Sequence, residues 1–384
     1  MKKYNLLNAL IAVFLIFTSC QELTEPTGTD LPIVTTGDAK NVTTKSAKLT
    51  GVISENGKVG GSLRWRVSLS NTFDEYQEYN DSGISQHGEV YNVIEGLTPN
   101  TTYYYYAYDT DGVSEVRGEV KSFTTLNLLT LKNVTLTDWD GTNKAFVHEK
   151  PMGVSLLGSS SFYNLETSYQ NGAWTFSKEI TAGIIDNLFA YWPLGQYKVD
   201  DTSILGIQTY KYDGIDLLYS GYTQTNEDKS SASLTMYHTM ARVIFHFSIA
   251  EDNLTNSEQV NYFDIDNGEN ILPTIADFSL VEGAFYNKKY SYPLQYNNQF
   301  TITKEKKNDI IIYSIPTTGG GNVDLTLGMG NGNKVSTSIG IEWQQGKTYE
   351  YNITYKKGML IVGDTRVEDW DNNNSGDIPV IDKN

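Results

Sequence analysis

Cys20 is the only cysteine in the chain, so its thiol cannot form a disulfide within one subunit. It follows a basic start, an apolar run from Leu6 to Phe17 and the small residues Thr18 and Ser19. This order is typical of a secretory signal that ends in a lipid-attachment site. The run is shorter than the ~20 helical residues that a lasting membrane span needs. We therefore expect cleavage after residue 19 and acylation of Cys20, for example with palmitate. The alternative is a plain secretory signal with an incidental cysteine.

The histidines give no catalytic or metal-binding pattern. An enzyme needs a nucleophile with a base, paired carboxylates or a metal cluster. His238 and His246 lie eight residues apart. On one continuous strand they would share a face about 26 Å apart, at ~3.3 Å per residue, too far for a shared metal. We interpret His238 as a structural hydrogen-bonding residue, and we expect no enzymatic activity. The full set of histidines is His87, His148, His238 and His246.

Several aspartate-rich segments offer oxygen ligands at alternate positions, which calcium favours. The best of them is Asp264-Ile265-Asp266-Asn267-Gly268, so Asp264 and Asp266 are weak calcium candidates. The later bidentate acid of a full calcium loop is missing in the expected register. Because aspartate and glycine are also ordinary turn residues, we expect a turn here and no cofactor.

Trp139 and Trp174 are the tryptophans with the most loop-like surroundings, since aspartate, asparagine and glycine flank them. An exposed aromatic ring can stack on the apolar face of a sugar. Both are therefore candidates for glycan stacking, and an exposed coplanar pair would favour a carbohydrate-binding function.

The charge balance argues against nucleic acid as a partner. The formal net charge is −17, and removal of residues 1–19, whose charged side chains are Lys2 and Lys3, lowers it to −19. Such a chain is repelled by phosphate backbones, although an acidic balance also simply keeps an exported protein soluble. The 27 tyrosines and 33 glycines, against 9 prolines, favour strands joined by tight turns.

Residues 20–30 have almost no apolar content and indicate a tether. From residue 31 the period changes to that of half-buried strands, and Trp65, between Leu63 and Val67, is predicted to be a core residue. The spacing Leu-x-Pro-x-x-x-Tyr ends at Tyr103, whose hydroxyl should bond a backbone group just upstream. Residues 31–125 resemble a fibronectin type III domain.

From residue 126 onward the pattern stays strand-like, with no sustained helical period. Ala241, Val243, Phe245 and Phe247 alternate and predict a central strand. Residues 343–355 predict a turn followed by a strand with an aromatic face. The charged, asparagine-rich stretches 225–230, 251–270 and 304–308 are expected to be surface loops.

Four segments, in this order, resemble the fimbrillin family, the pilus subunits, tip proteins and anchors of Bacteroidales. The resemblance covers about residues 127–375. Its segments are Phe189 to Gly195, Asp216 to Ser220, Leu234 to Phe247, and Trp343 to Thr354 continuing to Val367 to Trp370.

This resemblance implies an all-β fold with two transthyretin-like β-sandwich domains, 126–250 and 251–384, after the fibronectin-like one. It also implies fibres built by strand complementation, in which an N-terminal segment is cut after a basic residue and a partner strand fills the groove. Candidate cut sites are Lys132, Lys144 and Lys150. The tail with Ile378 and Val380 is either a donor strand or a flexible end, since Pro379 removes a ladder donor.

Two alternative functions are therefore considered, and the first is preferred. The first is a lipid-anchored fimbrial anchor, accessory or tip-like subunit at the outer membrane, with other fimbrial subunits as partners and a host protein or glycan as an adhesion ligand. The second is a carbohydrate-binding surface lipoprotein of a polysaccharide-uptake system.

Overall fold

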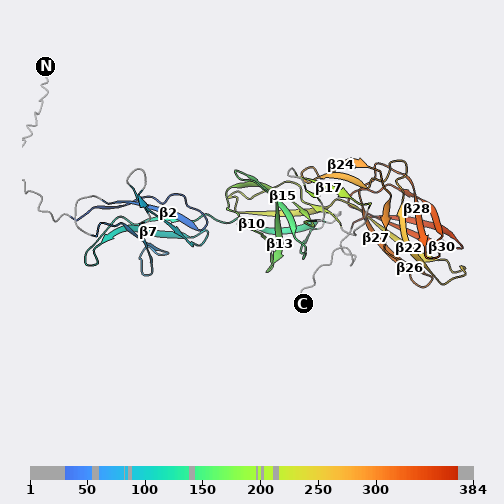
Figure 1. The fold of residues 1–384 in the computed structure, drawn as a ribbon, viewed down its shortest axis with the longest axis horizontal. Coiled ribbons are helices and arrows are strands. Elements are labelled where there is room, and N and C mark those ends of the chain that lie inside the picture. The colour runs from blue at the N-terminus through green and yellow to red at the C-terminus, as the bar shows by residue number, and fades with distance from the viewer. Residues whose placement is uncertain are drawn as a thin grey trace, which may run out of the picture. The chain divides into compact units, whose positions relative to one another are not determined.

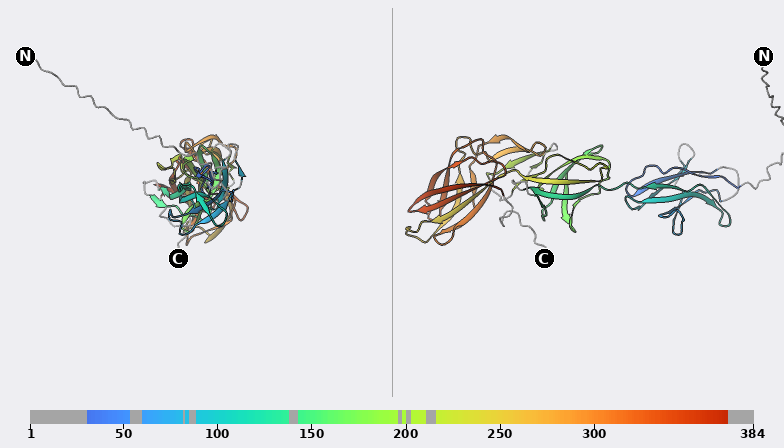
Figure 2. Two further views of the ribbon diagram at one scale, coloured as in Figure 1. Left: turned by 90° about the vertical axis from the view of Figure 1, so that its left-hand side faces the viewer. Right: turned by 180° about the vertical axis from the view of Figure 1, so that it is seen from behind.

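The computed structural model describes residues 31–53, 60–81, 83–84, 89–137, 143–195, 198–199, 203–210 and 216–370. Strands run through these parts and no helix occurs in them (Figure 1). Figure 2 shows the same strands from two further sides. The predicted all-β fold class is therefore confirmed. Within the described ranges, no helix has the length and apolar character that a membrane crossing would need. The signal segment 1–19, Cys20 and the tether 20–30 lie outside them.

The chain divides into two compact units, Met1–Thr125 and Leu126–Asn384. In the smaller unit one sheet has the strand order β1-β2-β6-β5 and the other has the order β4-β3-β7-β8, with β9 also pairing with β7. The bounds are Val34–Thr36 for β1, Ser46–Ile53 for β2, Arg64–Ser68 for β3, Gln77–Asn80 for β4, Gly83–Ile84 for β5, Val90–Glu95 for β6, Thr102–Thr110 for β7, Glu115–Arg117 for β8 and Lys121–Thr124 for β9.

The core of the smaller unit draws side chains from both sheets, which therefore pack face to face. Trp65 of β3 is fully buried in it, as the alternating pattern predicts. The Tyr103 hydroxyl, at the start of β7, accepts a hydrogen bond of 2.9 Å from the backbone N–H of Thr98. This bond is the upstream backbone contact that the spacing before Tyr103 predicts.

The larger unit begins with a long sheet of order β11-β10-β20-β18-β15-β12-β13-β14, with β19 also pairing with β15. Its main core contains apolar side chains from most of these strands. The bounds are Thr130–Thr137 for β10, Asn143–Ala145 for β11, Met152–Gly158 for β12, Phe162–Gln170 for β13, Ala173–Phe176 for β14, Ile185–Trp192 for β15, Leu218–Tyr219 for β18, Thr223–Gln224 for β19 and Ser231–His238 for β20.

A small sheet of order β16-β17-β23-β24 follows, and its buried side chains share a cluster with residues of β15, β27 and the end of β31. The bounds are Lys198–Val199 for β16, Ile204–Gln208 for β17, Ile275–Ser279 for β23 and Ala284–Lys289 for β24.

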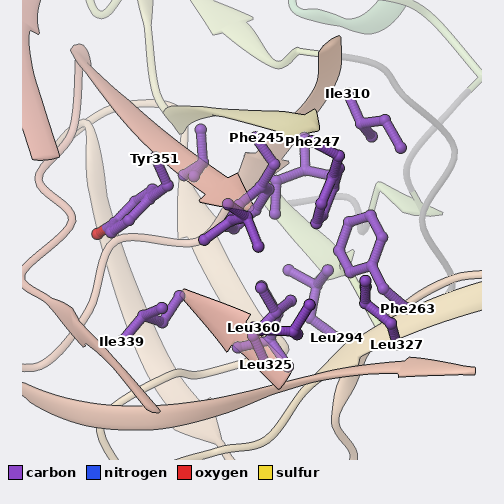
Figure 3. Close-up of a cluster of buried hydrophobic side chains, with 14 of the residues drawn as sticks. Phe245, Phe247, Phe263, Leu294, Ile310, Leu325, Leu327, Ile339, Tyr351 and Leu360 are labelled. Atoms are coloured by element: carbon purple, nitrogen blue, oxygen red, sulfur yellow. The ribbon is translucent and has the colours of Figure 1, made fainter. Parts of the chain in front are cut away.

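Two further sheets enclose the C-terminal core, one of order β27-β21-β30-β31 and one of order β25-β22-β28-β29, with β26 also pairing with β22. Figure 3 shows this core, in which Phe245 and Phe247 of one sheet lie near Phe263 and Leu327 of the other. The bounds are Ala241–Ile249 for β21, Ser257–Ile265 for β22, Leu294–Tyr296 for β25, Phe300–Thr303 for β26, Asn308–Ser314 for β27, Gly321–Met329 for β28, Lys334–Ile341 for β29, Lys347–Lys356 for β30 and Met359–Asp369 for β31.

β21 lies between β27 and β30, with Val243, Phe245 and Phe247 buried, which confirms the predicted central strand. It belongs to the C-terminal sheets, however, whereas the expected division at residue 250 places it in the preceding domain. β20 ends at His238 and β21 begins at Ala241, so the chain changes sheets between them. His238 and His246 therefore lie on different strands, β20 and β21, in different sheets.

The stretch 251–270 is not the surface loop that its charge and asparagine content predict. It contains β22, which pairs with β25, β26 and β28. Val260, Phe263 and Ile265 are fully buried. A register shift between Val260 and Tyr262 breaks the period of two, which explains why alternation did not reveal this strand.

Candidate functional site

β10, the first strand of the larger unit, lies between β20 and β11 in the long sheet. It pairs parallel with β20 and antiparallel with β11. Leu131, Val134 and Leu136 are buried on its inner side. Backbone hydrogen bonds and a row of apolar side chains are also what a strand from another chain would supply. The space that β10 fills is therefore a candidate strand-exchange site.

Two of the three lysines expected as cut sites lie in paired strands, and Lys150 lies in an exposed bend between β11 and β12. Lys132 lies within β10 and Lys144 within β11, both of which are paired. The Lys150 N–H donates to Nδ1 of His148 at 3.0 Å, and its carbonyl accepts the indole N–H of Trp192 at 3.1 Å. Proteolytic nicking favours exposed loop tips. The backbone is therefore bonded at Lys144 and Lys150, whereas Lys132 lies at a register shift between Leu131 and Asn133. The rest of β10 is built into the sheet by its pairs with β20 and β11.

The margin of the C-terminal sheets offers a second candidate site, which is not filled by a strand that the structure describes. Among the strands that the structure describes, β29 pairs with β28 alone and β31 pairs with β30 alone, so both are edge strands. A groove of about 520 Å³ lies beside them. Its lining includes Gly340, Ile341, Tyr351, Thr365 and Val367. An edge strand presents unpaired backbone N–H and carbonyl groups, which are a template for another strand.

The inner face of β31 is uncovered along this groove. Val367 is the register partner of Tyr349, so the two side chains leave the sheet on the same side. Tyr349 is 5% exposed, whereas Val367 is 55% exposed. Thr365, the partner of the buried Tyr351, is exposed too. The second layer therefore ends before it covers this end of β31.

Hydrogen-bonded aromatic residues form the floor of the groove. The Tyr351 hydroxyl donates to the Gly340 carbonyl at 2.9 Å and accepts the indole N–H of Trp343 at 3.0 Å. The backbone N–H of Gln344 donates to the Tyr349 hydroxyl at 2.9 Å. Burial raises the pKa of Tyr351 to about 12, so its hydroxyl stays protonated at neutral pH. The floor is therefore fixed, and Figure 3 shows Tyr351 at one side of the core.

His238 is buried in a cluster that secures the end of β31. Its Nδ1 lies 2.5 Å from Oδ2 of Asp216, and its ring stacks on Trp370 with centroids 3.9 Å apart. Tyr313 stacks on the same indole at 5.5 Å, and the Arg242 guanidinium lies 5.2 Å from it. Burial raises the pKa of the Asp216 carboxyl, and His238 opposes that shift. His238 is thus a buried hydrogen-bonding residue, and its cluster joins the long sheet to the C-terminal sheets.

Sequence reasoning placed Asp216 and Trp370 only in separate motif segments. Their convergence depends on the pairing of β18 with β20 and on the last strand reaching back to His238. No local pattern carries that information.

The weak calcium candidates Asp264 and Asp266 lie at the end of β22 and in the turn that follows it. Asp266 Oδ1 accepts the backbone N–H groups of Gly268 at 3.2 Å and Asp324 at 2.9 Å, which makes it a turn-stabilising acceptor. Asp264 lies next to the last residue of β22, and burial raises the pKa of its carboxyl. Within the part of the chain that the structure describes, no group of three or more His, Cys, Asp or Glu side chains could hold a metal ion.

Trp174 is not the exposed residue that glycan stacking requires. It is 6% exposed, its ring stacks on Phe146 with centroids 5.6 Å apart, and its indole N–H donates to the Phe146 carbonyl at 2.8 Å. Trp174 points to the inner side of β14 although its flanking residues are polar. The expectation that it is an exposed glycan-stacking residue is therefore wrong. Trp139, the tail with Ile378, and Cys20 lie outside the described residues.

The model of a family described as fimbrillin-like matches residues 142–370, more than half of the chain. No curated protein matches the sequence. Two solved structures of candidate cell adhesion proteins, from Bacteroides ovatus and Bacteroides uniformis, are each 15% identical, with TM-scores of 0.47 and 0.45. Each match covers 64% of this chain and 99% of the other. A fimbrial protein from Bacteroides vulgatus is 14% identical with a TM-score of 0.44, over 64% of this chain and 100% of that one. The family assignment rests on the family model alone.

Replacing His238 by alanine should destabilise the larger unit by about 3 kcal/mol, because it leaves the buried Asp216 carboxyl without its partner. His246→Ala is the matched control, since His246 also lies 2.6 Å from a carboxylate, that of Asp309, but at the surface. The control should cost less than about 1 kcal/mol. Urea unfolding of the purified variants measures both values. Equal losses would show that the His238 cluster does not secure the fold.

Proposed function

The chain belongs to the fimbrillin-like family, and on that premise we propose that it is a lipid-held anchor subunit of a fimbrium at the bacterial outer membrane. The observation that supports this proposal is the position of β10, which fills the candidate strand-exchange site of the long sheet and follows the smaller unit in the sequence. The lipid on Cys20 is part of the same proposal.

Chain order makes lipid retention and an emptied exchange site mutually exclusive. Cys20 precedes the smaller unit, which precedes β10. A cut that removed β10 would therefore also separate the larger unit from its lipid. A stalk subunit gives up its anchor in order to accept a partner strand there. An anchor keeps both β10 and the lipid, and it must hold its partner elsewhere.

The groove beside β29 and β31 offers such a place. An extended segment paired with the free edge of β29 would gain a ladder of backbone hydrogen bonds and cover Val367 and Thr365. We propose a fimbrial subunit with a free extended segment as this partner. Strand addition needs edges and pockets and no reacting group, so the proposed function is non-catalytic.

An accessory or tip-like place in the fibre is compatible with the same family. The roles differ in membrane attachment: an anchor at the base of the fibre must stay joined to the membrane, and an accessory or tip-like subunit need not. Lipid attachment therefore discriminates the two roles.

Changing Cys20 to alanine should release the protein from the membrane fraction, because the acyl chains supply its membrane affinity. Cell fractionation followed by immunoblotting measures the distribution, with Ser19→Ala as a neighbouring control that should stay membrane-bound. A Cys20→Ala protein that is still recovered with membranes contradicts lipid anchoring.

Changing Val367 to aspartate should lower the amount of co-purified fimbrial subunit by about tenfold or more, because an added strand would bury the new charge. Ile361→Asp is the matched control: Ile361 is 46% exposed on the same strand and pairs with Thr354, on the opposite face from Val367. It should have little effect. Affinity purification from cells that express each full-length variant gives the comparison. Undiminished capture by Val367→Asp rules out this groove as the partner site.

A further inference from the structure

The free edge of β29, in the groove that a fimbrial partner is proposed to fill, presents a defined set of backbone groups. At the hairpin that joins β28 to β29, the Met329 N–H donates to the Asn333 carbonyl at 2.8 Å. Because antiparallel pairs alternate between bonded and non-bonded ones, every second residue from Asn333 onward bonds to β28. Gly340 is one of the residues in between, so its N–H and carbonyl face the free edge.

Two further hydrogen bonds agree with this assignment. The Asp324 carbonyl accepts the Asp266 N–H at 3.0 Å, so the backbone of Asp324 faces β22 and its neighbours in β28 face β29. The Tyr351 hydroxyl reaches the Gly340 carbonyl from the other sheet. A carbonyl oxygen has two lone pairs, so Gly340 can still accept an N–H from an added strand. The edge at Gly340 is therefore open to pairing.

Gly340 leaves a bare strip on the outer side of β29. Ile339 and Ile341 are buried on the inner side, and Gly340 is exposed between them. Its φ is not positive, so the backbone itself does not require glycine. Among the described residues beyond its chain neighbours, a Cβ added at Gly340 would meet one heavy atom within 4 Å, Oδ1 of Asn322 at 3.6 Å. An aromatic side chain on a neighbouring strand can cover such an edge glycine.

An acidic side chain lies on the same outer side. Glu342 lines the groove and is exposed two positions after Gly340, and residues two apart in extended chain share a face. Lys347, the basic residue of the lining, is paired with Asp369. The charge that remains for a partner is therefore negative, and opposite charges on neighbouring strands attract.

On the premise of the function proposed above, we propose that the partner segment places an aromatic ring over Gly340 and a lysine or arginine beside Glu342. An apolar residue lies between these two and points inward, toward Thr365 and Val367 of β31. The aromatic and basic residues are thus two positions apart on one face of the segment. This pattern fixes the register, because a shift by one residue would turn the ring and the charge inward.

Binding of labelled peptides to the purified full chain, measured by fluorescence anisotropy, tests the pattern. The probe acetyl-Thr-Val-Lys-Val-Tyr-Val-Lys-Val-Thr-amide carries it in both chain directions and should bind. A peptide with serine in place of tyrosine should bind about fivefold more weakly. A peptide with both lysines replaced by glutamate should also bind more weakly, and Glu342→Lys should reverse this preference. Glu251→Lys, the same charge change at another exposed position, is the control and should leave the preference unchanged.

Gly340→Thr tests the strip under the ring. The variant should fold, because its Cβ has open space and a β-branched residue suits an exposed strand position. It should weaken the tyrosine peptide about fivefold and leave the serine peptide nearly unchanged. Ser336→Thr, on the same side of β29, is the matched control and should affect neither peptide.

Three results would overturn the pattern: the probe does not bind, the tyrosine and serine peptides bind equally, or Glu342→Lys leaves the charge preference as it was. The anchor proposal fails separately, through undiminished fimbrial capture by Val367→Asp. Reduced capture by Val367→Asp, together with equal effects of Gly340→Thr on the two peptides, would keep the groove as the partner site and refute only the residue pattern.

Discussion

The hydrogen-bonded position of β10 between β11 and β20 is the constraint on which the rest of the larger unit depends. Burial of one aliphatic side chain contributes about 1.5–3 kcal/mol, so the loss of Leu131, Val134 and Leu136 together would expose a core that the remaining sheet cannot cover. The space must therefore stay occupied, either by β10 or by a strand of another chain. Because β10 also connects the sheet to everything before it, its retention decides whether this protein keeps its N-terminal unit and its proposed lipid.

The other end of the larger unit is secured differently. Trp370 follows β31 directly and lies between His238 and Tyr313, so the last described strand is tied to the long sheet through aromatic packing and a buried carboxyl. A fixed β31 with an uncovered Val367 is a rigid margin, and a rigid margin lowers the ordering cost of an added strand. The same cluster that stabilises the fold thus prepares the proposed partner site.

Much of the fold follows from local sequence patterns. The predictions that were wrong have physical causes. The alternation through Val243, Phe245 and Phe247 predicted a central strand, and the spacing before Tyr103 predicted its bond to Thr98. β22 escaped notice because a register shift breaks its period, and the polar neighbours of Trp174 concealed a core position. The parallel pairings of β10 with β20 and of β21 with β30 join residues about a hundred positions apart, and only tertiary packing sets them. The groove beside β29 and β31 arises where one sheet stops short of the other, which no single-strand pattern encodes.

The most direct test of the anchor account is the intact mass and N-terminal analysis of the protein extracted from cells that bear assembled fimbriae. The account predicts one chain that begins at Cys20, carries acyl groups and still contains β10. A fimbria-associated chain that begins after Lys144 or Lys150 would contradict it, because both β10 and the lipid would then be lost. A chain that begins after Lys132 would contradict it through the loss of the lipid.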